Sequence, residues 1–135
     1  MDMQDRVLAV NMDNGWFEPA DRDVMADCML LVTEVAEMAE AYRDDLMTEH
    51  VEYKVVHGDG ATQTVLVRLG SPEDLNYRED WGLVGKPQGF PSECADVLVR
   101  LLDTCHRQGI DLSEAFDRKL AYNTTRGHRH GGKLA

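Results

Sequence analysis

Four acidic residues occur as two pairs with the same spacing. The pairs are Glu34 with Glu37 in "EVAE", and Glu93 with Asp96 in "ECAD". Residues three apart lie on one face of a helix, so each helix would present two carboxylates one turn apart. Carboxylate oxygens are the hard ligands that Mg²⁺ prefers. The two pairs therefore predict a divalent-metal site, with Mg²⁺ as the expected ion and Mn²⁺ as the alternative.

The charge around the first pair is unusual for an ordinary helix surface. The stretch 34–40, "EVAEMAE", has three glutamates and no basic residue. Exposed helices normally mix Lys with Glu, because opposite charges at this spacing stabilise a helix and like charges destabilise it. A solvated acidic face opposite an apolar face remains the alternative interpretation. Bound metal ions would cancel the repulsion, and this favours the metal site.

Helical patterns surround both pairs. Apolar residues at helical spacing (Met25, Cys28, Val32, Val35, Ala39 and Tyr42) form an apolar face on the first long helix. The second motif lies in a helix that Ser92 is expected to cap and Gly109 to end. We expect four helices, at about 2–12, from 19 or 21 to 45, from 92 to 108, and from a cap at Asp111 to about 125.

Between the two motifs the periodicity changes. The runs "VEYKVVH" at 51–57 and "TQTVLVRL" at 62–69 flank "GDGA", which predicts a β-hairpin. The segment 71–91 is rich in Gly and Pro and predicts a loop with one short turn. We interpret residues 48–91 as an insertion in a single domain that spans 1–135.

Composition limits the class of partner. The chain has 135 residues and a net charge of −11, which argues against a polynucleotide, because phosphate backbones require Lys and Arg. Apolar runs are too short to span a membrane, and the N-terminus has no basic signal-peptide region. The three cysteines are expected to be reduced and buried, in a cytoplasmic protein.

Longer segments around the pairs carry a family resemblance. "TEVAEMAEAYRD" and "KPQGFPSECADVLVRLLDTCHRQGIDL" resemble the two metal helices of the MazG-like, all-α nucleoside triphosphate pyrophosphohydrolases, and "KLAYNTTRGHRHGGK" resembles their terminal helix and tail. The resemblance covers roughly half of the chain in the family's order. The long segment between the motifs departs from the compact members, and no family role carries over to its predicted hairpin.

The resemblance implies an all-α bundle completed by forming a homodimer or homotetramer. It implies hydrolysis of a (deoxy)nucleoside triphosphate to the monophosphate and pyrophosphate, in nucleotide-pool house-cleaning. Glu34, Glu37, Glu93 and Asp96 match the metal-binding and catalytic positions. The expected substrate-binding residues are Arg100, on the same side of its helix as Glu93 and Asp96, the phosphate-contacting set Lys119, Asn123 and Arg126, and Trp16, which with Phe17 would stack on the base.

Two other classes of function stay open at this stage. The first is a non-enzymatic helical bundle that binds a nucleotide or a protein and acts as a regulator. The second is a di-iron redox bundle, which would need Glu-x-x-His on two helices. Asp103-x-x-His106 is the single near match in the sequence, which makes the di-iron class the weaker of the two.

Overall fold

The computed structural model describes residues 2–16, 18 and 22–126, and its architecture corrects the all-α prediction. Within these ranges the chain is mixed α/β, with five helices and a three-stranded antiparallel sheet. The predictions that involve Phe17, a helix start at Pro19 or Asp21, and the tail at 127–135 lie outside the described residues. The elements, in order, are α1 (Met3–Asp13), α2 (Val24–Arg43), β1 (His50–Val56), β2 (Thr62–Arg68), α3 (Pro72–Leu75), the π-helical turn η1 (Asn76–Asp80), β3 (Lys86–Gln88), α4 (Phe90–Arg107) and α5 (Leu112–Thr124).

Contacts divide the chain into two compact units. The central unit, Met25–Arg100, contains nearly all of α2, the sheet and the first half of α4. The terminal unit joins Met1–Val24 to Leu101–Ala135 and contains α1, the end of α4, and α5. The assignment of 1–135 to one domain stays a prediction.

The sheet explains why the all-α prediction was wrong. The predicted hairpin of β1 and β2 is confirmed, but β3, from the segment predicted as loop, adds to the other side of β1. Alternate residues of the strands face a small core formed by Val51, Tyr53 and Val67, against which Tyr77 and Leu83 pack. The insertion therefore has a hydrophobic core of its own and is more than a hairpin on a helical bundle.

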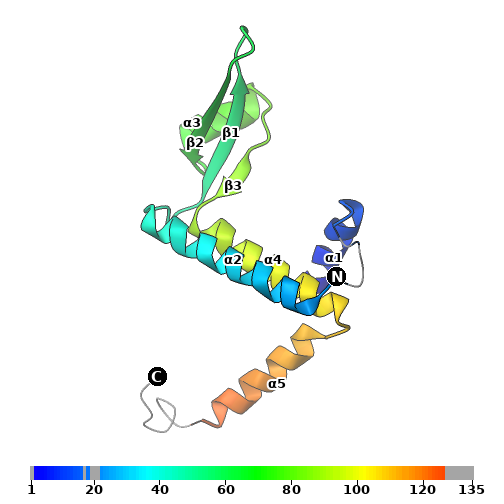
Figure 1. The fold of residues 1–135 in the computed structure, drawn as a ribbon. Coiled ribbons are helices and arrows are strands. Elements are labelled where there is room, and N and C mark those ends of the chain that lie inside the picture. The colour runs from blue at the N-terminus through cyan, green and yellow to red at the C-terminus, as the bar shows by residue number, and fades with distance from the viewer. Residues whose placement is uncertain (1, 17, 19–21, 127–135) are drawn as a thin grey trace. The chain divides into compact units, whose positions relative to one another are not determined.

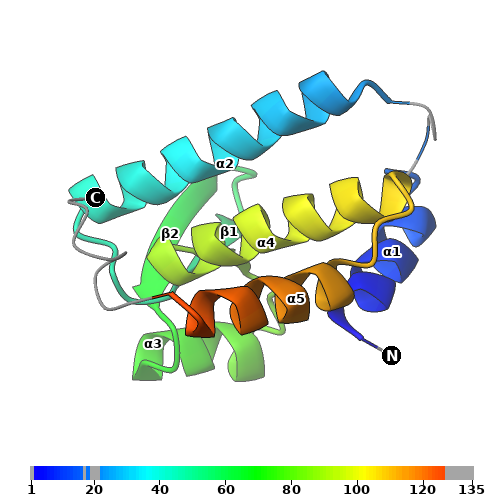
Figure 2. The ribbon, with the colours of Figure 1, turned by 90° about the horizontal axis from the view of Figure 1, so that it is seen from below.

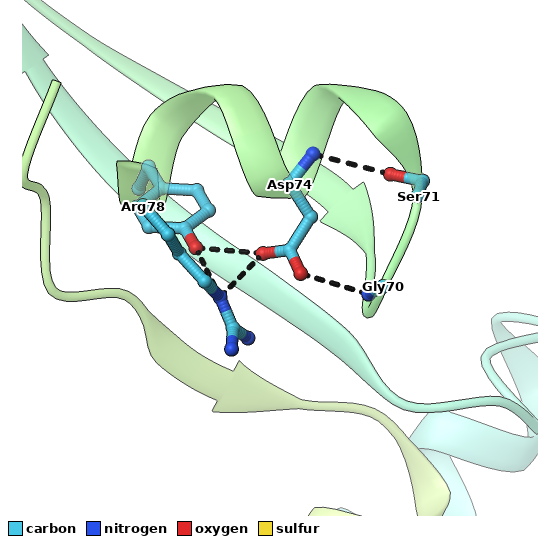
Figure 3. A network of polar contacts seen from close by, with 5 residues as sticks. Gly70, Ser71, Asp74 and Arg78 are labelled. Atoms are coloured by element: carbon cyan, nitrogen blue, oxygen red, sulfur yellow. Dashed lines mark hydrogen bonds and ion pairs between the residues drawn. The ribbon is translucent and has the colours of Figure 1, made fainter. Parts of the chain in front are cut away.

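A buried polar network fastens α3 and η1 to the sheet (Figure 3). The side chains of Tyr53 and Asp74 are fully buried, and Tyr53 Oη donates to Asp74 Oδ1 at 2.6 Å. Arg78 Nε donates to Tyr53 Oη and to Asp74 Oδ1, both at 3.0 Å. The Gly70 amide donates to Asp74 Oδ2 at 2.8 Å. Desolvation alone would raise the pKa of Asp74, but these hydrogen bonds and the Arg78 charge outweigh it and lower that pKa.

Gly85 allows the chain to pass close to the sheet core. A Cβ atom at this position would lie 2.0 Å from Val51 Cγ1 and 2.7 Å from Tyr53 Cε1. These distances are far shorter than the normal separation of non-bonded carbons. Only glycine fits here, and this close approach leads the chain into β3.

Helices α2 and α4 run side by side in opposite directions within the central unit (Figures 1 and 2). Cys94 Sγ lies 3.4 Å from Met38 Sδ, and Arg100 pairs with Glu34, so side chains further along α4 meet earlier turns of α2. The side of α2 toward α4 therefore includes an acidic residue of the first motif. The apolar face expected from the sequence is largely exposed, with Met25 67%, Val32 56% and Tyr42 64% accessible.

Several details of the helices differ from the sequence predictions. Helix α4 begins at Phe90, so Ser92 lies in its first turn and is not its cap. The cap of α5 is confirmed, because Asp111 accepts a hydrogen bond from the Glu114 amide. Cys105 is buried and Cys28 is exposed, contrary to the expectation that all three cysteines are buried. No helix in the described ranges is long and apolar enough to cross a membrane.

Candidate metal centre

Three of the four predicted metal ligands come together in the central unit. Glu34 and Glu37 lie on successive turns of α2, and Glu93 lies in the first turn of α4. Each can offer one carboxylate oxygen such that the three oxygens lie within 4.8 Å of one another. Such a set contains only hard oxygen donors, which fits Mg²⁺ or Mn²⁺ better than the softer metals that select nitrogen or sulfur. We call Glu34, Glu37 and Glu93 the carboxylate cluster.

Asp96, the fourth predicted ligand, is near this cluster without belonging to it. Its carboxylate is close enough to feel repulsion from Glu34, and it lies one turn after Glu93 on α4. Asp96 is exposed, whereas Glu34 and Glu93 are partly buried. It is thus placed beside the three oxygens, and its assignment as a ligand stays a prediction.

Arg100 contacts the cluster directly. Its Nη2 donates to Glu34 Oε1 at 2.7 Å, and its Nε donates to the same oxygen at 3.1 Å. The Glu34 side chain is only 12% exposed, so this charge-assisted pair fixes the orientation of the carboxylate. The structure therefore gives Arg100 a positioning role at Glu34, which the sequence analysis did not assign to it.

The close carboxylates perturb one another. Desolvation raises the pKa of Glu93, and repulsion from Asp96 and Glu37 adds to that increase. Desolvation, followed by repulsion from Glu34, also raises the pKa of Asp96. Lys86 opposes both increases by Coulomb attraction. Burial and mutual repulsion therefore disfavour the charged forms of Glu93 and Asp96, and a bound cation would favour them.

These raised pKa values predict that folding stability depends on pH in opposite directions with and without bound metal. In the metal-free protein, Glu93 and Asp96 bind protons more tightly when folded than when unfolded. Their contribution to stability is therefore present below the unfolded-state pKa and is lost as the pH rises through the raised folded pKa. Metal binding needs the deprotonated carboxylates, so Mg²⁺ should stabilise the protein at neutral pH and progressively less as the pH falls through the raised pKa values.

Thermal unfolding measured at a series of pH values, with Mg²⁺ and with chelator, checks this prediction. The difference between the two melting curves should shrink toward acidic pH. The double variant Glu93→Gln with Asp96→Asn should show almost no difference at any pH. An equal Mg²⁺ effect at pH 5 and pH 8 in the wild type would refute the link to these two carboxylates.

The remaining predicted site residues belong to the terminal unit. Trp16 follows α1, its side chain is 62% exposed, and its backbone oxygen accepts from Arg107 Nη2 at 2.7 Å. Lys119 and Asn123 are exposed on α5, and Lys119 Nζ lies 5.6 Å from the centre of the Tyr122 ring. Arg126 is exposed just beyond the end of α5. Their assignment to the phosphates and the base stays a prediction.

Asp103 has a structural role in the terminal unit. Its Oδ1 accepts from Asn11 Nδ2 and its Oδ2 from Arg107 Nε, both at 2.9 Å, and the Asp103 and Arg107 side chains are 6% and 1% exposed. These contacts explain why a third acidic residue follows Glu93 and Asp96 along α4. They also disfavour the di-iron alternative. Its single near match is Asp103-x-x-His106, and both carboxylate oxygens of Asp103 are already hydrogen-bonded.

Lys86 is the residue near the cluster that sequence reasoning missed. It lies in β3, inside a segment predicted as loop, so no local pattern predicted a fixed position for its side chain. Its nearness to Glu93 along the chain was the available signal.

Comparison of the chain with protein-family models, with curated proteins and with solved structures finds no match in any of the three. The resemblance to the MazG-like pyrophosphohydrolases accordingly rests on the motifs themselves.

Proposed function

We propose that this chain is a magnesium-dependent nucleotide pyrophosphohydrolase that converts a (deoxy)nucleoside triphosphate to the monophosphate and pyrophosphate. The observation that carries the proposal is the carboxylate cluster, whose three oxygens on two antiparallel helices lie within 4.8 Å. A triphosphate would be repelled by so acidic a surface unless divalent ions lay between them. In this proposal the carboxylates bind the divalent ions, and these ions in turn bind the triphosphate.

The chain's own groups have distinct tasks in this reaction. Glu34, Glu37 and Glu93 would hold Mg²⁺, and Arg100 keeps the Glu34 carboxylate oriented. Bound Mg²⁺ supplies neutralisation of phosphate charge and a lower pKa for a coordinated water. A carboxylate with one oxygen free of the metal can accept the proton of the attacking water, and exposed Glu37 is our candidate.

Product analysis tests the reaction class. A panel of standard and modified NTPs and dNTPs would be incubated with the protein in Mg²⁺ or in chelator. The proposal predicts Mg²⁺-dependent release of pyrophosphate and a nucleoside monophosphate in equal amounts. A folded, Mg²⁺-binding protein that releases neither product would favour the regulatory bundle that binds a nucleotide or a protein.

The exposed face of α2 supports self-association as part of the proposal. We call Met25, Met29, Val32, Val35 and Tyr42 the α2 stripe. All five side chains are at least 44% exposed, although they recur at helical spacing as core residues do. An apolar stripe of this length on a helix of 20 residues is typical of a surface that another protein surface covers. We expect a second copy of the chain to cover it.

Light scattering coupled to size exclusion checks the expected oligomer. The wild type should be a homodimer or homotetramer at micromolar concentration, and Val32→Glu should shift it toward monomer. Thr33→Glu is a matched control, because it adds the same charge to the neighbouring exposed position off the stripe. A monomeric wild type, or equal effects of the two variants, would contradict this assignment.

A further inference from the structure

Lys86 has a fixed backbone position shortly before the first turn of α4, which carries Glu93 of the carboxylate cluster. It lies in β3, directly opposite Glu52 of β1. The junction of β3 with α4 is anchored to the segment after α2, because the Phe90 amide donates to Leu46 O at 2.8 Å. At Gly89, which has φ +101°, an added Cβ would lie 2.6 Å from Thr48 O. Strand pairing and this tight junction hold β3 at a set distance from the first turn of α4.

The positive charge of Lys86 acts on the carboxylates, but its ammonium group forms no ion pair with them. It attracts the carboxylates of both Glu93 and Asp96. Its side chain is exposed, and among the described residues it makes no hydrogen bond or ion pair, even with Glu52 opposite. Arg100, the other cation acting on Asp96, is already bound to Glu34. The ammonium of Lys86 is therefore available to a ligand that arrives at the cluster.

A lysine is a compact charge with three donors, which suits phosphate oxygens. Carboxylates and an available ammonium side by side can bind the two parts of a metal–polyphosphate complex, the cation on the carboxylates and the anion on the lysine. A lysine that served only to reduce repulsion among the carboxylates would be expected to form an ion pair with one of them.

We propose that Lys86 is a substrate-binding residue that contacts phosphate oxygens of the nucleotide bound at the carboxylate cluster, so that the inserted sheet completes the site. This inference rests on the proposed function and extends it to the segment between the two metal motifs. The sheet's role is to carry a cation to the acidic helices.

Two binding measurements on Lys86→Gln test this role without relying on catalysis. The first is calorimetric titration with inorganic tripolyphosphate in excess Mg²⁺, and the second is Mn²⁺ binding followed by EPR. Lys86→Gln should bind tripolyphosphate about tenfold more weakly, equivalent to about 1.4 kcal/mol. It should bind Mn²⁺ more tightly, because a repelling cation has been removed from the cluster. Lys86→Arg keeps the charge and should recover most of the tripolyphosphate affinity.

Lys54→Gln is the matched control. Lys54 is exposed, and it lies on the same face of the sheet as Lys86, two residues along β1 from Glu52. The Lys54→Gln substitution should leave the affinities for tripolyphosphate and for Mn²⁺ unchanged. Unchanged tripolyphosphate binding by Lys86→Gln would overturn the inference, and so would parallel losses of Mn²⁺ and tripolyphosphate affinity, which indicate a structural role.

The proposed function can fail separately from this inference. A wild type that binds Mn²⁺ and tripolyphosphate but hydrolyses no nucleotide would refute the pyrophosphohydrolase, while the opposite changes in Lys86→Gln would still support a phosphate-binding lysine. Conversely, a hydrolase whose Lys86→Gln variant keeps wild-type affinities would refute the role of Lys86 alone.

Discussion

Replacing Glu93 by Gln should lower kcat/KM for Mg²⁺-dependent pyrophosphate release by about 10³-fold, while the metal-free protein becomes more stable. Gln keeps the shape of the side chain and removes a negative charge that Asp96 and Glu37 repel. The same substitution removes a metal ligand, so the variant should also lose the stabilisation that Mg²⁺ gives the wild type. A loss of activity with a gain of stability is the result expected of a residue kept for function.

Glu40→Gln is the control for this experiment. Glu40 is on α2, one turn after Glu37, but its side chain is 64% exposed and it pairs with Arg43 at 3.5 Å. Activity assays and thermal unfolding in chelator should show a variant close to the wild type. If Glu93→Gln kept full activity, or if Glu40→Gln lost as much, the carboxylate cluster would not be the catalytic centre.

The second large effect is expected in the inserted segment between the two metal motifs. Asp74→Ala should lower the midpoint of thermal unfolding by roughly 10 °C or more. The substitution leaves the buried Tyr53 hydroxyl and the Gly70 amide without their acceptor, and Arg78 without its buried partner. Circular dichroism during heating, and hydrogen exchange of the β1 amides, would measure the loss.

Glu73→Ala separates this effect from a general loss of helix charge. Glu73 neighbours Asp74 in α3 and is exposed, so its removal should change the midpoint little. Because the hydrogen bonds and the Arg78 charge outweigh burial and lower the pKa of Asp74, the network's stabilisation should also be lost as the pH falls through that lowered pKa. Equal stability of the two variants would show that the network does not hold the sheet together.

The sequence was informative where a pattern is local. Two i,i+3 acidic pairs on helical segments predicted that Glu34, Glu37 and Glu93 would be available on helix faces, and the structure brings these three together. The hairpin of β1 and β2 followed from β-branched runs around a turn, and its register confirms that prediction. In both cases neighbouring residues in the chain carry the whole signal.

The sequence failed where long-range contacts decide the structure. The strand β3 is three residues long and includes Pro87, so its own residues favour a loop, and only pairing with β1 makes it a strand. That pairing is what fixes Lys86. The apolar pattern of α2 likewise predicted a face but not its partner, and within one chain the stripe remains exposed.

Anomalous diffraction from crystals soaked in Mn²⁺ tests the central claim most directly. The account predicts a peak at about 2.2 Å from carboxylate oxygens of Glu34, Glu37 and Glu93, and its loss in Glu93→Gln crystals soaked in the same way. Mn²⁺ bound elsewhere on the protein, with the three carboxylates making no metal contact, would contradict the account.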